Sequence, residues 1–415
     1  MESSSKTNWG VVTLALTAGI LAAAHYGKAP TALPEIRSQI PISLIVCGWI
    51  MSVFSLTGVA FGIAAGTFAD RLGAKQLAML GLGTLSLGSL IGGLANSGEM
   101  LLFSRIIEGF GFITVAVSAP ILIMRASTLE DLQLSLGIWS TYMPVGMALS
   151  MILTPILVAV MGWRALWIVI SATTLLWLFL VWLKTDNGNR ARPDAVQPSH
   201  GLLENVLLTI RTPGPWLLSI GFGFYTLQWI SLMAWLPSFL VEQRGLSLEM
   251  TGLLTALVVA ANIPGNLTVG WLLRWGVTRS TTLIISATGL GITVLGIFND
   301  GFSDLSRFLL CLAFSYFGGM TPGSIVSGAP AVAPTHGQIG TVNGMLVQGS
   351  HTGQLLGPPA LAALATYTGS WQETRWLMLA SAGSIIVISL LFRRLVMNKR
   401  VKRQSADSID TDRGP

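Results

Sequence analysis

Gly66-Thr67-Phe68-Ala69-Asp70-Arg71-Leu72-Gly73-Ala74-Lys75 is the stretch that decides the fold. It ends a long apolar run that begins at Ile50, and it then places an acid, a base, a glycine and a second base in quick succession. Gly73 lets the chain reverse where a side chain would clash, and Asp70 can bond backbone N–H groups or pair with a base on a neighbouring helix. Arg71 and Lys75 are expected to hold this loop on the cytoplasmic side of a membrane.

This order of residues resembles the loop between the second and third helices of the major facilitator superfamily of secondary transporters. The resemblance covers the whole chain, although its motifs are concentrated in the first half. It implies two helical bundles that rock about a central site. It also implies an inner gate formed by Asp70 and Arg71 together with Gly66 and Gly73.

The composition of the 415 residues is that of a membrane protein. Charged residues make up 10% and hydrophobic residues 52%, whereas soluble domains carry about 25% charged residues. The net charge of +6 does not indicate nucleic-acid binding, because the bases punctuate apolar runs and do not gather on one face. Cys47 and Cys311 lie within apolar runs as small hydrophobes, and the histidines show no ligand spacing. No cofactor or metal is therefore expected.

Twelve apolar segments are long enough to cross a bilayer core of about 30 Å, which takes roughly 20 helical residues. They lie near residues 9–30, 43–69, 76–96, 99–124, 133–160, 164–184, 215–241, 250–273, 280–298, 306–331, 338–366 and 373–396. Gly146 and Gly353, like Trp163 and Trp371, recur at an offset of about half the chain, which indicates an internal duplication. The expected fold is an all-α membrane protein with two pseudo-symmetric six-helix bundles.

The polar stretch after the sixth segment divides the chain. We expect an N-terminal six-helix bundle at 1–184, a cytoplasmic linker at 185–213, a C-terminal six-helix bundle at 214–398 and a cytoplasmic tail at 399–415. Most of the 24 Lys and Arg residues fall on the side of the N-terminus, and seven of them lie at the C-terminus, from Arg393 onward. The positive-inside rule then puts both termini in the cytoplasm. The prediction is a multi-pass protein of the cytoplasmic membrane of a bacterium.

Two ionisable groups lie inside the fourth segment, in Leu102-Phe103-Ser104-Arg105-Ile106-Ile107-Glu108-Gly109-Phe110-Gly111. This run resembles the superfamily motif Arg-x-x-(Gln/Glu)-Gly-x-Gly. Arg105 and Glu108 share one helix face and can pair, and ionisable groups at membrane depth are by default functional candidates. Arg105 would attract an anion, and Glu108 would be the proton site. The alternative is an ion pair whose only role is to hold the fourth segment against the first.

The first segment ends in His25, Tyr26 and Lys28. The apolar run from Gly10 to Ala24 is too short to span at 1.5 Å per residue, so these polar residues must complete the crossing. They are candidates for the substrate path beside Arg105, and two cations near one cavity favour an anionic substrate. Lys28 could instead extend its ammonium to the outer surface.

The second half offers neutral polar groups at membrane depth. Gln228, Tyr316 and Gln348 are candidates for hydrogen bonds to a substrate, although each is more often an interhelical bond. Two glycine stripes also stand out, one on helix 2 from Gly58 through Gly62 and one on helix 11 from Gly349. Such stripes let helices approach closely, and in the superfamily these two helices meet between the halves.

The best reading is proton-coupled uptake of a small organic or inorganic anion by a monomer. The stretch from Lys28 to Arg37 loosely resembles the cyanate and nitrate/nitrite permease relatives. One alternative is proton-antiport efflux of amphipathic compounds or drugs, which an aromatic set would suit: Trp49, Trp139, Tyr142, Tyr225 and Trp229. A sensor without turnover is a third class. An enzyme comes last, because the chain has no phosphate-loop or hydrolase motif.

Overall fold

Helices form the secondary structure of the computed structural model, which describes residues 6–63, 73–128, 130–139, 141–185, 202–335 and 338–412. Their bounds in chain order are α1 Trp9–Gln39, α2 Leu44–Ser52, the 3-10 turn η1 Val53–Ser55, α3 Leu56–Phe61, α5 Ala74–Gly93, α6 Gly98–Ala126, α7 Leu132–Trp139, α8 Tyr142–Lys184, α9 Leu202–Ile210, α10 Pro213–Arg244, α11 Leu248–Ala260, α12 Asn262–Arg274, α13 Arg279–Ile297, α14 Asp304–Val326, α15 Ala329–Val332, α16 Ile339–Thr368 and α17 Thr374–Asp412. No strand occurs within these ranges.

Ten helical segments among the described residues are long and apolar enough to cross a membrane. One of them, α8, has 43 residues, and Gly162 at φ 78° interrupts its helical backbone in the middle. A straight helix of that length would measure about 65 Å, twice the bilayer core, so α8 reverses at Gly162 and crosses twice. The 30-residue α16 packs along α10 and supplies the remaining crossing. The twelve predicted crossings are therefore confirmed.

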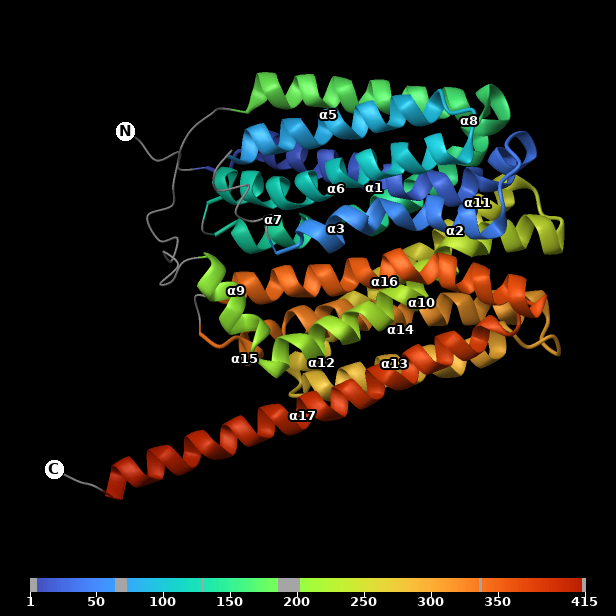
Figure 1. Ribbon diagram of the computed structural model, residues 1–415. Helices are drawn as coiled ribbons and strands as arrows, with labels where there is room; N and C mark the ends of the chain where they lie inside the picture. The colour runs from blue at the N-terminus through green and yellow to red at the C-terminus, as the bar shows by residue number, and fades with distance from the viewer. Residues whose placement is uncertain are drawn as a thin grey trace.

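The helices form two bundles (Figure 1), one from α1 to α8 and one from α10 to α17. The start of α1 and the end of α17 lie at the same end of the helices, which we call the terminal end; the opposite end is the far end. α9 is a short helix inside the predicted linker, where Leu202, Val206 and Leu207 supply apolar residues at helical spacing. The domain boundaries and the cytoplasmic placement of the termini stay predictions.

The end of the first helix was predicted wrongly. α1 does not close at Lys28 but continues through Pro30 and Pro34 to Gln39. The side chain of Asn8 caps its first turn by accepting a hydrogen bond from a backbone N–H. Prolines are tolerated inside membrane helices because neighbouring helices satisfy the freed backbone groups. The polar residues from His25 to Lys28 consequently lie in the middle of α1.

The last helix is also longer than expected. The backbone of α17 remains helical to Asp412, beyond the predicted end of the span near residue 396, and projects away from the bundle (Figure 1). No proline or glycine interrupts the sequence between Thr374 and Asp412 except Gly383. Because good helix formers such as Lys, Arg, Gln and Ala fill the segment after the span, nothing in the sequence stops the helix there.

The two bundles touch along their far halves. At Gly48 on α2, an added methyl group would lie 2.8 Å from Pro359 Cα on α16. At Gly252 on α11, it would lie 2.4 Å from the carbonyl oxygen of Met151 on α8. Arg37 at the end of α1 also pairs with Glu242 on α10 at 2.5 Å. Glycines of both bundles thus permit close backbone approach along the seam, by which we mean the surface where the two bundles meet.

The second glycine stripe has a different neighbour from the expected one. Gly349 and Gly353 on α16 lie against backbone carbonyls of Ser219 and Gly223 on α10, so this stripe packs within the C-terminal bundle. The stripe on α3 does face α16, because the His351 ring covers Gly58. A glycine pattern marks a smooth helix face but does not identify the helix that will cover it.

Candidate functional site

Four polar side chains meet in the middle of the N-terminal bundle. His25 and Lys28 lie on α1, and Arg105 and Glu108 lie on α6; none has any exposed surface. Within each pair the residues are three positions apart, so each pair occupies one helix face. The predicted gathering of these four residues is therefore what the structure shows. We call them the ionic cluster.

Glu108 is the centre of the ionic cluster. Its Oε1 accepts a hydrogen bond from Lys28 Nζ at 2.6 Å and lies 3.0 Å from His25 Nδ1. Its Oε2 accepts a hydrogen bond from Arg105. α5 packs tightly behind the carboxylate, because a methyl group added at Gly88 would lie 2.8 Å from the Glu108 backbone nitrogen. Glu108 is thus held by both cations, which is the arrangement that makes a buried charge tolerable.

Backbone and hydroxyl groups hold the two cations in place. Arg105 donates to the carbonyl of His25 at 2.8 Å and to that of Ile50 at 3.3 Å. Lys28 donates to the hydroxyl of Ser89 on α5 at 2.7 Å, and its ammonium lies 4.5 Å from the ring centroid of Trp167. Neither Ser89 nor Trp167 was predicted to join this site, since a serine or tryptophan in an apolar helix carries no signal of its partner.

The ionic cluster carries a net positive charge when His25 is neutral, because two cations face one carboxylate. One edge of it is unused. Arg105 Nη2 and the hydroxyl of Tyr26 are buried and lack hydrogen-bond partners among the residues that the structure describes. Both lie against the ring of Phe54, with the Arg105 guanidinium carbon 4.5 Å from its centroid and the Tyr26 ring centroid at 5.2 Å. Donors that are buried and unpaired are suited to an anionic acceptor.

His25 links the carboxylate to a hydroxyl. Its Nε2 lies 2.9 Å from Thr174 Oγ1 on α8, which also lies 2.8 Å from the carbonyl of Ile170. In neutral His25 with its proton on Nδ1, the ring donates to Glu108 and accepts from Thr174. A second proton on Nε2 requires only that the Thr174 hydroxyl turn to Ile170. His25 can therefore gain a proton without breaking any contact of Glu108, whereas a proton on Glu108 would displace a cation.

The three candidates from the second half do not join the ionic cluster. Tyr316 shares a hydrogen bond with Thr268 on α12 at 3.0 Å, and Gln348 donates to the carbonyl of Val59 on α3 at 2.9 Å. Both residues thus form interhelical hydrogen bonds, which was the alternative to a substrate contact. Gln228 on α10 is fully buried, and both polar atoms of its amide lack a partner within the described ranges.

The comparisons with known proteins identify the family. The model of the Major Facilitator Superfamily matches residues 14–346. The chain belongs to this superfamily.

Relatives in the superfamily include a hexuronate transporter of Bacillus subtilis, 24% identical over 94% of this chain and 95% of that protein. A methylenomycin A resistance protein of the same organism is 24% identical over 40% of this chain and 36% of that protein. The cyanate transport protein of Escherichia coli is 26% identical over 57% and 59%, which confirms the predicted likeness to cyanate permeases. The solved inward-facing, unoccupied structure of a bacterial homologue of the human lysosomal transporter Spinster has a TM-score of 0.77, 17% identity, and coverage of 97% of this chain and 99% of that chain.

Membership of the superfamily makes the chain a multi-pass transporter of the bacterial cell membrane and not an enzyme. Of the predicted superfamily gate, Gly66, Asp70 and Arg71 lie outside the described residues. Gly73 has φ 80° directly before α5, as expected for a reversing chain. Lys75 donates to the carbonyl of Trp182 at 2.9 Å and to that of Thr185, and so caps the end of α8. The gate itself stays a prediction.

Proposed function

We propose that this transporter carries a small organic or inorganic anion into the cell together with a proton. The observation that carries the proposal is the positive ionic cluster with an unpaired, buried Arg105 Nη2. The hexuronate and cyanate relatives, which are named for anions, support the same substrate class. Arg105 and Lys28 supply the attraction, and Tyr26 and His25 supply nearby polar groups. The unpartnered amide of Gln228 is proposed as a contact from the C-terminal bundle.

The charge of the cluster supports the proposed proton coupling. A proton taken up by His25 adds one positive charge beside Lys28 and Arg105 while Glu108 keeps its contacts. In a medium of low dielectric constant this added charge strengthens the binding of an anion, and by linkage the anion strengthens the binding of the proton. We therefore propose that the proton site is the His25–Glu108 pair, in place of Glu108 alone.

A second candidate function is efflux of amphipathic compounds. Trp139 and Tyr142 stack with ring centroids 4.2 Å apart, and Tyr142 continues to Phe112 at 6.4 Å and from there to Phe54 at 5.2 Å. This aromatic row offers an apolar surface beside the ionic cluster. The methylenomycin A resistance protein is a relative named for this class of function, over part of the chain.

The test is transport in proteoliposomes that enclose a pH-sensitive dye. Hexuronates, cyanate and short carboxylates and sulfonates are added outside, one at a time, with bulky cations and neutral amphiphiles as the comparison set. The proposal expects internal acidification with one class of anion. If none of the anions causes acidification, and bulky cations or neutral amphiphiles drive proton exchange instead, the proposal is overturned in favour of efflux.

Variants separate binding from coupling. His25→Asn keeps a polar side chain but cannot titrate, so we expect it to bind the anion, seen as a raised unfolding temperature, without acidification. Arg105→Lys keeps the charge but loses the fork that reaches two carbonyls. One charged hydrogen bond is worth about 1.5–3 kcal/mol, so affinity should fall about 10- to 100-fold. Gly383→Ala, where an added methyl group meets open space, is the neutral control.

A further inference from the structure

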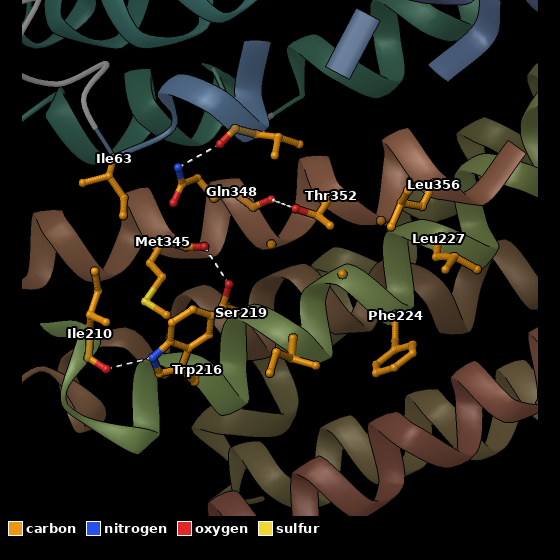
Figure 2. A pocket seen from close by; sticks show the side chains of 15 residues that line it. Ile63, Ile210, Trp216, Ser219, Phe224, Leu227, Met345, Gln348, Thr352 and Leu356 are labelled. Atoms are coloured by element: carbon orange, nitrogen blue, oxygen red, sulfur yellow. Dashed lines mark hydrogen bonds between the residues drawn. The ribbon is translucent and has the colours of Figure 1, made fainter. Parts of the chain in front are cut away.

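An apolar groove of about 420 Å³ runs along the outside of the C-terminal bundle where it meets α3 (Figure 2). Its two long walls are α10, from Trp216 to Leu227, and α16, from Met345 to Leu356. Val59 and Ile63 of the N-terminal bundle close one side. We call it the seam groove, since both bundles contribute to it.

The polar groups that line the seam groove are already bonded within the protein. Ser219 Oγ donates to the carbonyl of Met345 at 2.7 Å, and Thr352 Oγ1 donates to that of Gln348 at 2.8 Å. The Gln348 amide donates across to Val59. Figure 2 shows the Ser219 bond joining α10 to α16, the Gln348 bond joining α16 to α3 and the Thr352 bond running along α16. An occupant therefore gains little from polar groups, and an apolar one fits best.

The seam groove has the length of one membrane leaflet. Each wall covers eleven residue steps, or about 16 Å of helix at 1.5 Å per residue, and half of a bilayer core measures about 15 Å. The groove lies in the half of the protein nearest the terminal end, because its walls begin close to the starts of α10 and α16. Its mouth is open to the membrane: Trp216, Ile220 and Leu356 are each more than two fifths exposed.

The end of the groove nearest the terminal end has the features of a membrane–water interface. Trp216 donates from its indole to the carbonyl of Ile210 at 2.8 Å, and tryptophan prefers this depth. Arg211 follows Ile210 directly and is exposed. An exposed arginine at this depth attracts the headgroup of an anionic lipid.

We propose that the seam groove holds one acyl chain of an anionic phospholipid from the leaflet at the terminal end, with its headgroup beside Arg211. Because α3 belongs to one bundle and α10 and α16 to the other, the groove must change shape when the bundles move relative to each other. The bound chain would then favour the arrangement in which the groove is open. The proposal is independent of the transported substrate.

Photo-crosslinking in liposomes tests it. The probe is phosphatidylglycerol with a diazirine near the end of one acyl chain, and phosphatidylcholine with the same chain is the second arm. Crosslinked peptides are mapped by mass spectrometry. We expect phosphatidylglycerol to label α10 and α16, near Leu227 and Leu356, more strongly than it labels other membrane-facing helices. Arg211→Gln should remove the advantage of phosphatidylglycerol.

Variants that fill the groove provide the control. Ile220→Trp and Thr352→Trp place a large ring in it, and labelling of α10 and α16 should fall to the level of α13. Ile292→Trp on α13 changes another membrane-facing isoleucine, 63% exposed, and should leave the labelling unchanged. Uniform labelling of all membrane-facing helices, equal labelling by both lipids, or labelling that persists in both filled variants would overturn the proposal.

Discussion

Lys28 donates to Glu108 Oε1 across 2.6 Å and joins α1 to α6 at a depth where neither side chain is exposed. Three residues earlier on each helix lie His25 and Arg105, which also contact Glu108. The single carboxylate is therefore the only counter-charge that the described residues supply to the two cations of the ionic cluster. Its removal would leave two positive charges buried together.

Glu108→Gln should be strongly destabilising for this reason. Removal of one partner of a buried ion pair costs about 3–5 kcal/mol, whereas replacement of both partners by neutral groups is often tolerated. We expect a large drop in the unfolding temperature of the purified protein with Glu108→Gln. The double variant Lys28→Met with Glu108→Gln should recover part of it. An unchanged unfolding temperature in Glu108→Gln would show that Glu108 does not carry the compensating charge.

Much of the architecture and the four residues of the ionic cluster could be predicted from the sequence. The lengths of apolar runs set the number of crossings, because the bilayer has a fixed thickness. Arg105 and Glu108 were recognisable from their spacing and their depth in an apolar run. These are local properties of the chain, and local properties are what a single sequence carries.

The remaining features depend on contacts between distant segments. The polar residues from His25 to Lys28 looked like the end of a helix, but α1 continues because Glu108 on α6 contacts both His25 and Lys28 at mid-membrane. Ser89 could not be distinguished from other hydroxyls until α5 was placed beside α1. The spacing of Gly353 predicted close packing but not that α10 would be its partner.

Gly252→Ala should disturb the contact between the bundles and little else. Its added methyl group would meet the Met151 carbonyl oxygen at 2.4 Å, so α11 and α8 must separate at the far end. Native Cys47 on α2 is fully buried in the same half, and its reaction with a maleimide reports opening there. In a Cys311→Ser background we expect faster labelling of Cys47 with Gly252→Ala than with Gly383→Ala. Equal rates would mean that the seam does not depend on this close approach.

Asp300 should not contribute to the pH dependence of transport. A hydrogen bond from Arg307 at 2.6 Å, aided by Gln372, lowers the pKa of Asp300 in the loop between α13 and α14. Because its pKa is lowered in the folded protein, ionised Asp300 contributes fully to the stability of the fold above the pKa of about 3.9 that an aspartate has in the unfolded chain. This contribution is lost only as the pH falls below that value. Asp300→Asn should therefore leave the shape of the transport profile between about pH 5 and 8 unchanged. A shifted midpoint in that window would contradict this assignment.

Arg37 and Glu242 form a bond between the bundles that should bias the resting state. The pair joins the end of α1 to α10 at 2.5 Å, with side chains 31% and 39% exposed. Exposed ion pairs are worth about 0.2–1 kcal/mol, which is enough to change a two-state population by up to about fivefold. Because the pair must separate when the far end opens, Arg37→Gln should raise the labelling rate of Cys47 by up to that factor.

The reversed pair, Arg37→Glu with Glu242→Arg, should return the rate toward that of the unmodified pair, since attraction across the seam is restored. If the reversed pair labels as fast as Arg37→Gln alone, the two residues act independently and the bond does not hold the far end closed.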